Sequence, residues 1–337
     1  MVPTFFLMGP SDIEGQSWTK KKRLENGKVK GTAQWSGFLP IAPFIMADAT
    51  LSAKSTFVMM GIHETLKIPK NARINLFNLV GDADASATTL KTIQALENKI
   101  QPLRYFNRVS DVFKTSRARL PITLLNIPGC SVPRVKTSNP GSFDEFASAC
   151  EEFAAWPLIV RARGYHGGEY MLLLEDSSRL DIIKDKPWIY NGIFLIEYVD
   201  YRNEQGLYQK NRIIMVDGVP YPRHSIFSDQ WAVHAASRAD LMRQDIELCR
   251  QEEKFLAYLG DAGMKEYGEI FKAIQDRIGL DIFGIDFALV DGKVVIFEAN
   301  VCMNFLGQNY GEHGRYQYLE GYVKNLKRAV KKMLLNA

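Results

Sequence analysis

The sequence predicts a protein of mixed α/β and α+β class that is divided into several modules. At 337 residues, the chain is too long for one simple domain, and two or three packed modules are expected. Strand, loop and helix patterns follow one another in the first third of the chain, which is typical of an α/β module. Nearer the C-terminus, a long helical region precedes two strand-like runs, and this order indicates helices that lie on a sheet.

The composition indicates a globular protein with reduced thiols. Hydrophobic residues make up 46% of the chain and charged residues 24%, which is ordinary for a globular protein. The formal net charge of +4 does not argue for a nucleic-acid partner, although it suits a site for anionic phosphates. The four cysteines form neither a CxxC pair nor a zinc spacing, which indicates a reducing compartment.

The sequence shows no export or membrane segment. Its first residues, MVPTFFLMGPSD, lack the basic and long apolar regions of a signal peptide. No window approaches the ~18 uninterrupted apolar residues that a membrane span requires. We therefore expect a cytoplasmic protein with no membrane partner.

The first 115 residues have the pattern of an α/β module. An apolar run at residues 4–8 opens the chain. Residues 18–31 are polar, and we expect their basic run, KKKR at residues 20–23, to lie in a solvated loop. Residues 73–80 alternate like a strand, and residues 86–100 have helical spacing with apolar positions on one side.

Helix signals and periodicity predict the rest of the chain. Ser142 and Glu145 form a capping box for a helix over residues 143–155, and Trp156-Pro157 ends that helix. The other predicted elements are a helix at 111–125, strands at 131–135, 158–162, 169–175, 193–199 and 212–216, a glycine-rich loop at 164–168, helices within 236–278 and a C-terminal amphipathic helix.

The run from residue 278 to 305 carries the most informative pattern. Two strand-like runs, 283–290 and 294–298, flank an Asp-Gly turn. Glu298 and Asn300 are two apart, so their side chains point to one face, and a hairpin brings Asp286 alongside. Two carboxylates and a carboxamide form an all-oxygen site that suits Mg²⁺ with phosphate oxygens, and hence ATP. The same spacing also fits an ordinary hairpin with polar residues on its wet face.

Four features occur in a particular order along the chain. Arg161 stands on a strand before the glycine loop, an apolar strand ends at Glu197, Arg212 heads another strand, and the Asp286, Glu298 and Asn300 hairpin follows. This order resembles the ATP-grasp superfamily of carboxylate–amine ligases, which includes ribosomal-protein glutamate ligases, glutathione synthetases and D-alanine–D-alanine ligases. The resemblance extends from about residue 105 to residue 305.

The resemblance implies a fold and a reaction. Two α+β lobes, at residues 116–195 and 196–337, would clasp ATP after an N-terminal α/β module at residues 1–115. A substrate carboxylate would attack the γ-phosphate, and an amine would then attack the resulting acyl phosphate. The implied cofactors are ATP and Mg²⁺, the latter on Asp286, Glu298 and Asn300. The implied partners are small-molecule or peptide carboxylates and amines, and a homo-oligomer stays open.

The resemblance also assigns nucleotide contacts. Arg161 takes the place of a family lysine that neutralises phosphate, and Arg117 best fits the position of an earlier one. Arg161 could instead be a structural ion-pair residue, and Lys114 and Arg119 are the other candidates for the earlier position. The remaining implied nucleotide contacts are the loop residues His166, Gly167 and Gly168, the adenine-pocket residues Ile159, Glu197, Tyr198 and Val199, and Glu204 or Asp200 near the ribose.

The catalytic set implied by the resemblance consists of Arg161, Arg212 and Arg223. Arg212 matches an arginine that contacts the γ-phosphate and the acyl substrate, and a plain salt bridge is the alternative. Arg223 opens the polar and aromatic segment 223–234, which we expect to hold the substrate carboxylate. Two other functions remain open, namely a phosphotransferase that uses no amine and a nucleotide-binding module without turnover.

Overall fold

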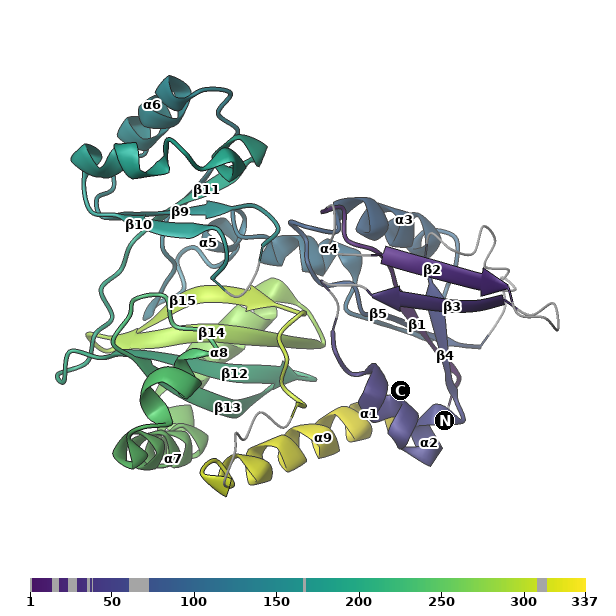
Figure 1. The fold of residues 1–337 in the computed structure, drawn as a ribbon. Coiled ribbons are helices and arrows are strands. Elements are labelled where there is room, and N and C mark those ends of the chain that lie inside the picture. Colours follow the sequence, from purple (N-terminus) through teal and green to yellow (C-terminus); the bar gives the residue numbers. More distant parts are fainter. Residues whose placement is uncertain are drawn as a thin grey trace.

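The structure is a computed structural model that describes residues 2–13, 18–23, 29–34, 37, 39–60, 73–165, 168–307 and 314–337, with the backbone alone at 18–23 and 29–34. Its described strands form three main sheets and one separate hairpin. In Figure 1 the N-terminal sheet lies to the right, and the second and third sheets lie one above the other on the left. The predicted class, an α/β module followed by α+β layers, is confirmed.

The N-terminal module is a parallel four-stranded sheet with the order β4-β1-β5-β6. A phenylalanine from each strand forms one stacked row: Phe6 lies 5.1 Å from Phe57 and 5.4 Å from Phe77, which lies 5.0 Å from Phe106. These aromatic contacts fix the register of all four strands. The strands are β1 (Thr4–Met8), β4 (Ser55–Met59), β5 (Asn75–Asn78) and β6 (Arg104–Phe106).

Other elements surround this sheet. The predicted helix after residue 86 is α3 (Ala87–Glu97). The basic run, expected in a loop, instead belongs to a strand of an antiparallel hairpin. The single helix expected at 111–125 is wrong, because the backbone becomes extended at Ser116 and Pro121 opens a new helix. The elements are β2 (Trp18–Arg23), β3 (Val29–Gln34), α1 (Ala42–Ala47), α2 (Ala49–Ser52), α4 (Val109–Val112), η1 (Phe113–Thr115) and α5 (Leu120–Thr123).

The second sheet is antiparallel, with the order β10-β9-β11-β8. The capping box is confirmed: the Ser142 hydroxyl accepts a hydrogen bond from the Glu145 amide, and the Glu145 carboxylate accepts one from the Gly141 amide. The strand expected at 131–135 is wrong, because Pro133 separates two strands that join different sheets. The elements are α6 (Phe143–Phe153), β8 (Val135–Ser138), β9 (Leu158–Ala162), β10 (Met171–Leu174), β11 (Ile193–Glu197), η2 (Ser177–Ile183) and η3 (Pro187–Asn191).

The third sheet has the order β13-β12-β14-β15-β7 and carries the predicted Asp-Gly hairpin. Asp291 and Gly292 both have positive φ, as the tight hairpin turn requires. The segment expected to hold substrate begins as a strand. The elements are β7 (Cys130–Ser131), β12 (Tyr208–Val216), β13 (Val219–Ser228), β14 (Ile282–Val290), β15 (Lys293–Asn300), the π-helix η4 (Arg238–Met242), α7 (Ile246–Gly260), α8 (Ala262–Ile278) and α9 (Leu319–Leu335).

The hydrophobic interior is divided unequally among these sheets. One large core joins the N-terminal sheet to the third sheet, for example through Phe106 and Phe283. A separate core inside residues 146–195 serves the second sheet alone, and Phe146 and Leu195 belong to it. The division of the chain at residues 115 and 195 stays a prediction, and β11 spans the second of these positions.

Asn107 fastens the N-terminal module to the third sheet. Its side-chain oxygen accepts hydrogen bonds from the amides of Asp281 and Ile282 at 2.9 and 3.0 Å, and its side-chain nitrogen donates to the Ile282 carbonyl at 3.1 Å. Asn107 adopts φ +51°, a conformation that asparagine tolerates better than most residues. The Asn107 side chain thereby makes the backbone hydrogen bonds that a neighbouring strand would otherwise make at the start of β14.

Candidate active site

The central cavity lies between the second and third sheets. We use this name for the space bordered by Ile159 and Ile196 from the second sheet and by Asp286 and Glu298 from the third. Ile159 and Arg161 border it from β9, Ile196 and Glu197 from β11, and Asp286, Phe297 and Glu298 from β14 and β15. A cavity with both apolar and charged lining suits a ligand that is itself part apolar and part anionic.

The three predicted metal ligands lie together at the end of the hairpin. Asp286 is opposite Glu298 in the register, and Gly284 is opposite Asn300. The register shifts by one residue after Asp286, so the bulge at this point sets where the two acids meet. The Asn300 side-chain nitrogen donates to Oε1 of Glu298, which confirms that these two side chains share a face.

Asp286 is almost fully buried between two cations. Arg212 Nε lies 2.6 Å from its Oδ1 and Nη2 lies 2.8 Å from its Oδ2, while Lys210 Nζ lies 3.5 Å from Oδ2. Burial by itself raises the pKa of Asp286, but Arg212 and Lys210 outweigh burial and lower the pKa below its usual value. The carboxylate is therefore charged at neutral pH.

The donor set of this hairpin fits a hard divalent cation. Within the described residues, no three His, Cys, Asp or Glu side chains gather closely enough to hold a metal, and the candidate donors here are two carboxylates and the amide of Asn300. The Asn300 side-chain oxygen is buried without a hydrogen-bond partner. A buried oxygen acceptor beside two carboxylates is a donor arrangement that Mg²⁺ accepts.

Two arginines border the central cavity near these acids. Arg161 is buried, and its Nη2 donates to the Tyr165 carbonyl at 2.6 Å. Burial, together with the positive charge of Arg117, lowers the pKa of Arg161 to about 10, so Arg161 remains charged at neutral pH. Arg117 Nη2 lies 3.3 Å from Oε1 of Glu298. Both arginines therefore present fixed positive charge beside the acid cluster.

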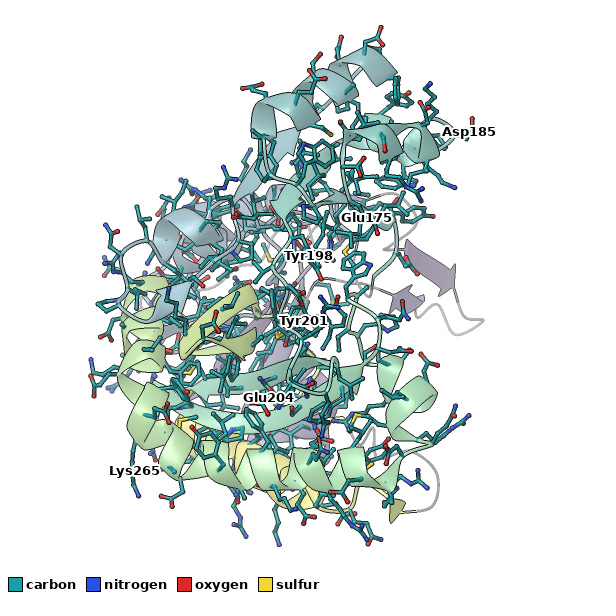
Figure 2. The ribbon with its side chains drawn as sticks, turned by 90° about the vertical axis from the view of Figure 1, so that its left-hand side faces the viewer. Glu175, Asp185, Tyr198, Tyr201, Glu204 and Lys265 are labelled. Atoms are coloured by element: carbon teal, nitrogen blue, oxygen red, sulfur yellow. The ribbon has the colours of Figure 1, made fainter. Side chains whose placement is uncertain are left out.

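The predicted adenine-side residues all border the central cavity; they are Ile159, Glu197, Tyr198 and Val199. The Tyr198 hydroxyl is 2.7 Å from that of Tyr208, and Glu197 Oε2 accepts a hydrogen bond from the Arg134 amide at 3.1 Å. Figure 2 shows Tyr198 and Tyr201 where the chain passes from the upper lobe to the lower sheet. The segment that follows β11 thus forms one border of the cavity.

The glycine loop reaches both neighbouring modules. His166 and Gly167 lie outside the described residues. Gly164 has φ +75°, and a Cβ atom there would lie 2.7 Å from the Ile13 side chain of the N-terminal module. Gly168 has φ +86°, and a Cβ atom there would lie 3.4 Å from His234. The two described ends of the loop therefore need glycine for its backbone conformation.

A third group of residues forms a separate cavity of about 560 Å³, which we call the arginine-lined cavity. Arg212 borders it and also binds Asp286, which borders the central cavity. The predicted Arg223 borders it too, and its guanidinium donates to the carbonyls of Phe305 and Gly307 at 2.8 and 3.0 Å. One ion pair thus stands between the two cavities.

No family model and no curated protein matches this chain. Solved structures do match. A RimK-domain ATP-grasp protein from Sphaerobacter thermophilus has a TM-score of 0.52 at 13% identity, over 88% of this chain and 96% of that one. D-alanyl-alanine synthetase A from Vibrio cholerae has a TM-score of 0.52 at 10% identity, over 99% of both chains. The chain has the ATP-grasp fold.

A third match carries a ligand. The D-alanine–D-alanine ligase of Bacillus anthracis, whose structure contains ATP, has a TM-score of 0.50 at 12% identity, over 100% of this chain and 98% of that one. The ATP-grasp fold implied by the sequence is therefore confirmed over the whole chain. No helix in the described part of the chain is long and apolar enough to cross a membrane.

Within this ATP-grasp fold, Glu204 does not reach the central cavity. Asn203 Oδ1 accepts hydrogen bonds from the amides of Gln205 and Leu207, and these bonds fold residues 203–207 into an exposed turn. Glu204 at its tip borders a different, shallow pocket and lies well below Tyr198 in Figure 2. This position of Glu204 gives no support to its predicted contact with the ribose, which stays a prediction.

Several charged residues at the ATP-grasp site escaped the sequence analysis. Lys210 borders the central cavity, two residues before Arg212 on the same strand. Asp82 and Asp84 approach from the N-terminal module and border a small pocket that also includes Arg117. Asp84 Oδ2 accepts a hydrogen bond from the Arg117 amide at 2.9 Å, and burial raises the pKa of Asp84. Of these residues, only Lys210 had a signal in the sequence: it is two residues from Arg212, so both side chains lie on one face of the strand.

Proposed function

We propose that the protein is a Mg²⁺- and ATP-dependent ligase that joins a carboxylate to an amine. The observation that carries this proposal is the cluster of Asp286, Glu298 and Asn300 beside the cations Arg161 and Arg117, at a cavity between two sheets of an ATP-grasp fold. Acids that hold a metal and cations that hold phosphates are the two requirements of a nucleotide-triphosphate site.

The lining of the central cavity supports a particular placement of ATP. Ile159, Ile196 and Val199 offer an apolar slot for the adenine ring. Arg161 and Arg117 lie where the phosphate chain would approach the acids, and guanidinium groups bind phosphate through paired hydrogen bonds. Asp286, Glu298 and Asn300 would hold Mg²⁺, whose positive charge would offset that of the phosphates.

The proposed reaction has two steps. A carboxylate oxygen of the first substrate attacks the γ-phosphorus, the bond to the ADP oxygen breaks, and an acyl phosphate forms. The lone pair of an amine then attacks the acyl carbon, phosphate leaves with the bonding electrons, and the ammonium proton passes to solvent. Arg212 can donate hydrogen bonds to the transferring phosphoryl group through Nη1, because its pair with Asp286 uses Nε and Nη2.

Hydroxylamine trapping tests the proposal. An acyl phosphate reacts with hydroxylamine to give a hydroxamate, whereas the phosphorylated hydroxyl product of a phosphotransferase does not. ADP release and hydroxamate formation should both depend on ATP, Mg²⁺ and a carboxylate substrate. ADP release without hydroxamate, from an alcohol substrate, would instead identify a phosphotransferase.

A binding measurement separates catalysis from nucleotide recognition. Mg²⁺ and ATP together should raise the melting temperature, since a ligand at one hundred times its Kd adds about 2.7 kcal/mol to the stability of the folded state. A shift without any ADP release would support a nucleotide-binding module without turnover. No shift with millimolar ATP or ADP would contradict the proposed function.

A further inference from the structure

The arginine-lined cavity has an unusual charge. Its charged and titratable lining consists of Arg212, Arg223, Arg238, Arg243, Arg315 and His224. Among the described residues no aspartate or glutamate borders it. Five guanidinium groups around one space of about 560 Å³ repel one another, and a negatively charged occupant would reduce that repulsion.

Acids outside the cavity offset two of the five charges. Arg212 pairs with Asp286, as described above. Arg238 pairs through both terminal nitrogens with Glu252, which is fully buried behind the cavity. Glu252 also accepts hydrogen bonds from the Ser225 amide and the Tyr318 hydroxyl. These two pairs hold Arg212 and Arg238 in place at the back of the cavity.

Arg243 and Arg315 lie at the more exposed part of the cavity. No acid in the described part of the chain forms an ion pair with either of them, although Arg315 donates a hydrogen bond to the Arg243 carbonyl. A carbonyl oxygen carries no formal charge and so does not neutralise Arg315. Both side chains can therefore pair with anionic groups of a ligand.

The pKa of His224 is affected by the positive charges around the cavity. It is buried on β13, and burial together with Arg212, Arg223, Arg238 and Lys210 keeps its pKa well below the usual value. These cations come from β12, β13 and η4, the elements that pack around the imidazole. The imidazole is consequently neutral at pH 7 and offers a hydrogen bond to a ligand without charge repulsion.

The remaining lining leaves room for a sizeable ligand. Ala235, Ala236 and Ala239 border the cavity with the smallest side chains that a helix or turn can carry without glycine. Arg238 lies over the ring of Tyr316, with its guanidinium carbon 4.8 Å from the ring centre. The buried part of the cavity is therefore held rigid, while its volume stays open.

We propose that this cavity binds the acyl-donating substrate, and that this substrate carries at least two further negative groups, carboxylate or phosphate, besides the carboxylate that reacts. The inference rests on the proposed ligase function for the reaction itself. Arg212 borders this cavity and pairs with Asp286, which borders the central cavity, so Arg212 places the reacting carboxylate towards the acid cluster. Arg243 and Arg315 then hold the additional charges at the far end.

Titration calorimetry with simple anions tests this inference. The probes are butyrate, glutarate, tricarballylate and inorganic tripolyphosphate, added to the full chain with Mg²⁺ and a non-hydrolysable β,γ-imido analogue of ATP that fills the nucleotide site. Affinity should rise from butyrate to tricarballylate. Tighter binding of tripolyphosphate than of tricarballylate would identify phosphate as the additional group, and the reverse order would identify carboxylate.

Two variants localise the binding. Arg243→Gln and Arg315→Gln should each weaken tricarballylate or tripolyphosphate binding about tenfold or more, the effect of one charged hydrogen bond. Arg250→Gln is the matched control, because Arg250 is exposed on α7, pairs with Glu247 and borders no described cavity. Equal affinity for all four probes, or unchanged affinity in both cavity variants, would overturn the inference.

The melting-temperature shift with ATP separates the two proposals. All three arginine variants should keep the wild-type shift, since none of these residues borders the central cavity. A normal ATP shift with no polyanion binding overturns the substrate inference alone. No ATP shift overturns the ligase proposal, while polyanion binding that depends on Arg243 and Arg315 would still support an anion site.

Discussion

Arg212 on β12 lies opposite Asp286 on β14 in the register and binds both oxygens of its carboxylate, at 2.6 and 2.8 Å. Asp286 is 2% exposed, so this pair is formed away from bulk water. A buried ion pair is not by itself evidence of high stability, but removing one partner leaves an uncompensated charge. The pair therefore couples the stability of the third sheet to the Mg²⁺ and ATP binding proposed for Asp286, Glu298 and Asn300.

The first prediction concerns this pair. Asp286→Ala leaves Arg212 and Lys210 without their carboxylate, and we expect the free energy of unfolding to fall by about 3–5 kcal/mol. Urea denaturation measures the change. The double variant Arg212→Met/Asp286→Ala should lose less than the sum of the two single variants, because it removes the orphaned guanidinium. Strictly additive losses would show that the two side chains do not depend on each other.

The second prediction concerns Glu298. Glu298→Gln keeps the shape of the side chain and removes its charge, so turnover should be lost if Glu298 holds Mg²⁺. Stability should change little, since the repulsion between Glu298 and Asp286 that disappears offsets the lost ion pair of Glu298 with Arg117. ADP release and urea denaturation measure the two effects. Glu204→Gln, at the exposed turn outside the central cavity, is the control, and full activity of Glu298→Gln would remove Glu298 from the metal site.

The third prediction concerns Arg161. Arg161→Ala should weaken ATP binding by about 1.5–3 kcal/mol, and Arg161→Lys should recover part of this loss because it restores the charge. Binding should not depend on the ionisation of Arg161 between pH 6 and 8, since its pKa of about 10 keeps it charged there. Calorimetric titration with ATP measures the effect. Arg163 lies on the turn after β9 and is hydrogen-bonded to Asn139, so Arg163→Ala should bind ATP normally.

Unchanged ATP affinity in Arg161→Ala would assign Arg161 a structural role instead. Its hydrogen bond to the Tyr165 carbonyl offers such a role, since it holds the start of the glycine loop. The melting temperature without ATP distinguishes the two. A structural role lowers that temperature and leaves the affinity intact, whereas a phosphate contact mainly lowers the affinity.

The fourth prediction concerns the pH dependence of stability. The pKa of His224 lies well below its usual value in the folded protein, whereas the unfolded chain binds a proton near pH 6.5. Below that pH the unfolded state therefore holds one more proton, and stability falls by up to about 1.4 kcal/mol per pH unit. Urea denaturation at pH 7.5 and 5.5 should show this slope in the wild type and a smaller slope in His224→Gln. Equal slopes would exclude His224 as its source.

The sequence predicted those parts of the site that depend on local periodicity. Asp286, Glu298 and Asn300 share one hairpin, so the two-residue period and the Asp-Gly turn were enough to bring them together. The apolar strands and the capped helix of the second sheet were predicted for the same reason. The break at Ser116 and Pro121 was missed because the apolar spacing there continues through a change of backbone direction.

Contacts between distant segments were not readable in the same way. Asp82 and Asp84 reach the site from the N-terminal module, and only the packing of two sheets against each other brings them near Arg117. Arg238, Arg243 and Arg315 come from a π-helix, its end and the chain before α9. Their sequence separation gives no periodic pattern, so the arginine-lined cavity appears only once the fold is known.

The separate core of the second sheet has a consequence for motion. Residues 146–195 pack on one another, whereas the N-terminal and third sheets share one core and the Asn107 hydrogen bonds. We expect the upper lobe in Figure 1 to rotate as a rigid unit about the chain segments before β8 and after β11. We then expect the free energy of opening the central cavity to be independent of the stability of the third sheet, which carries Asp286 and Glu298. Substitutions in those two segments should alter the rate of nucleotide exchange and leave the geometry of the metal ligands unchanged.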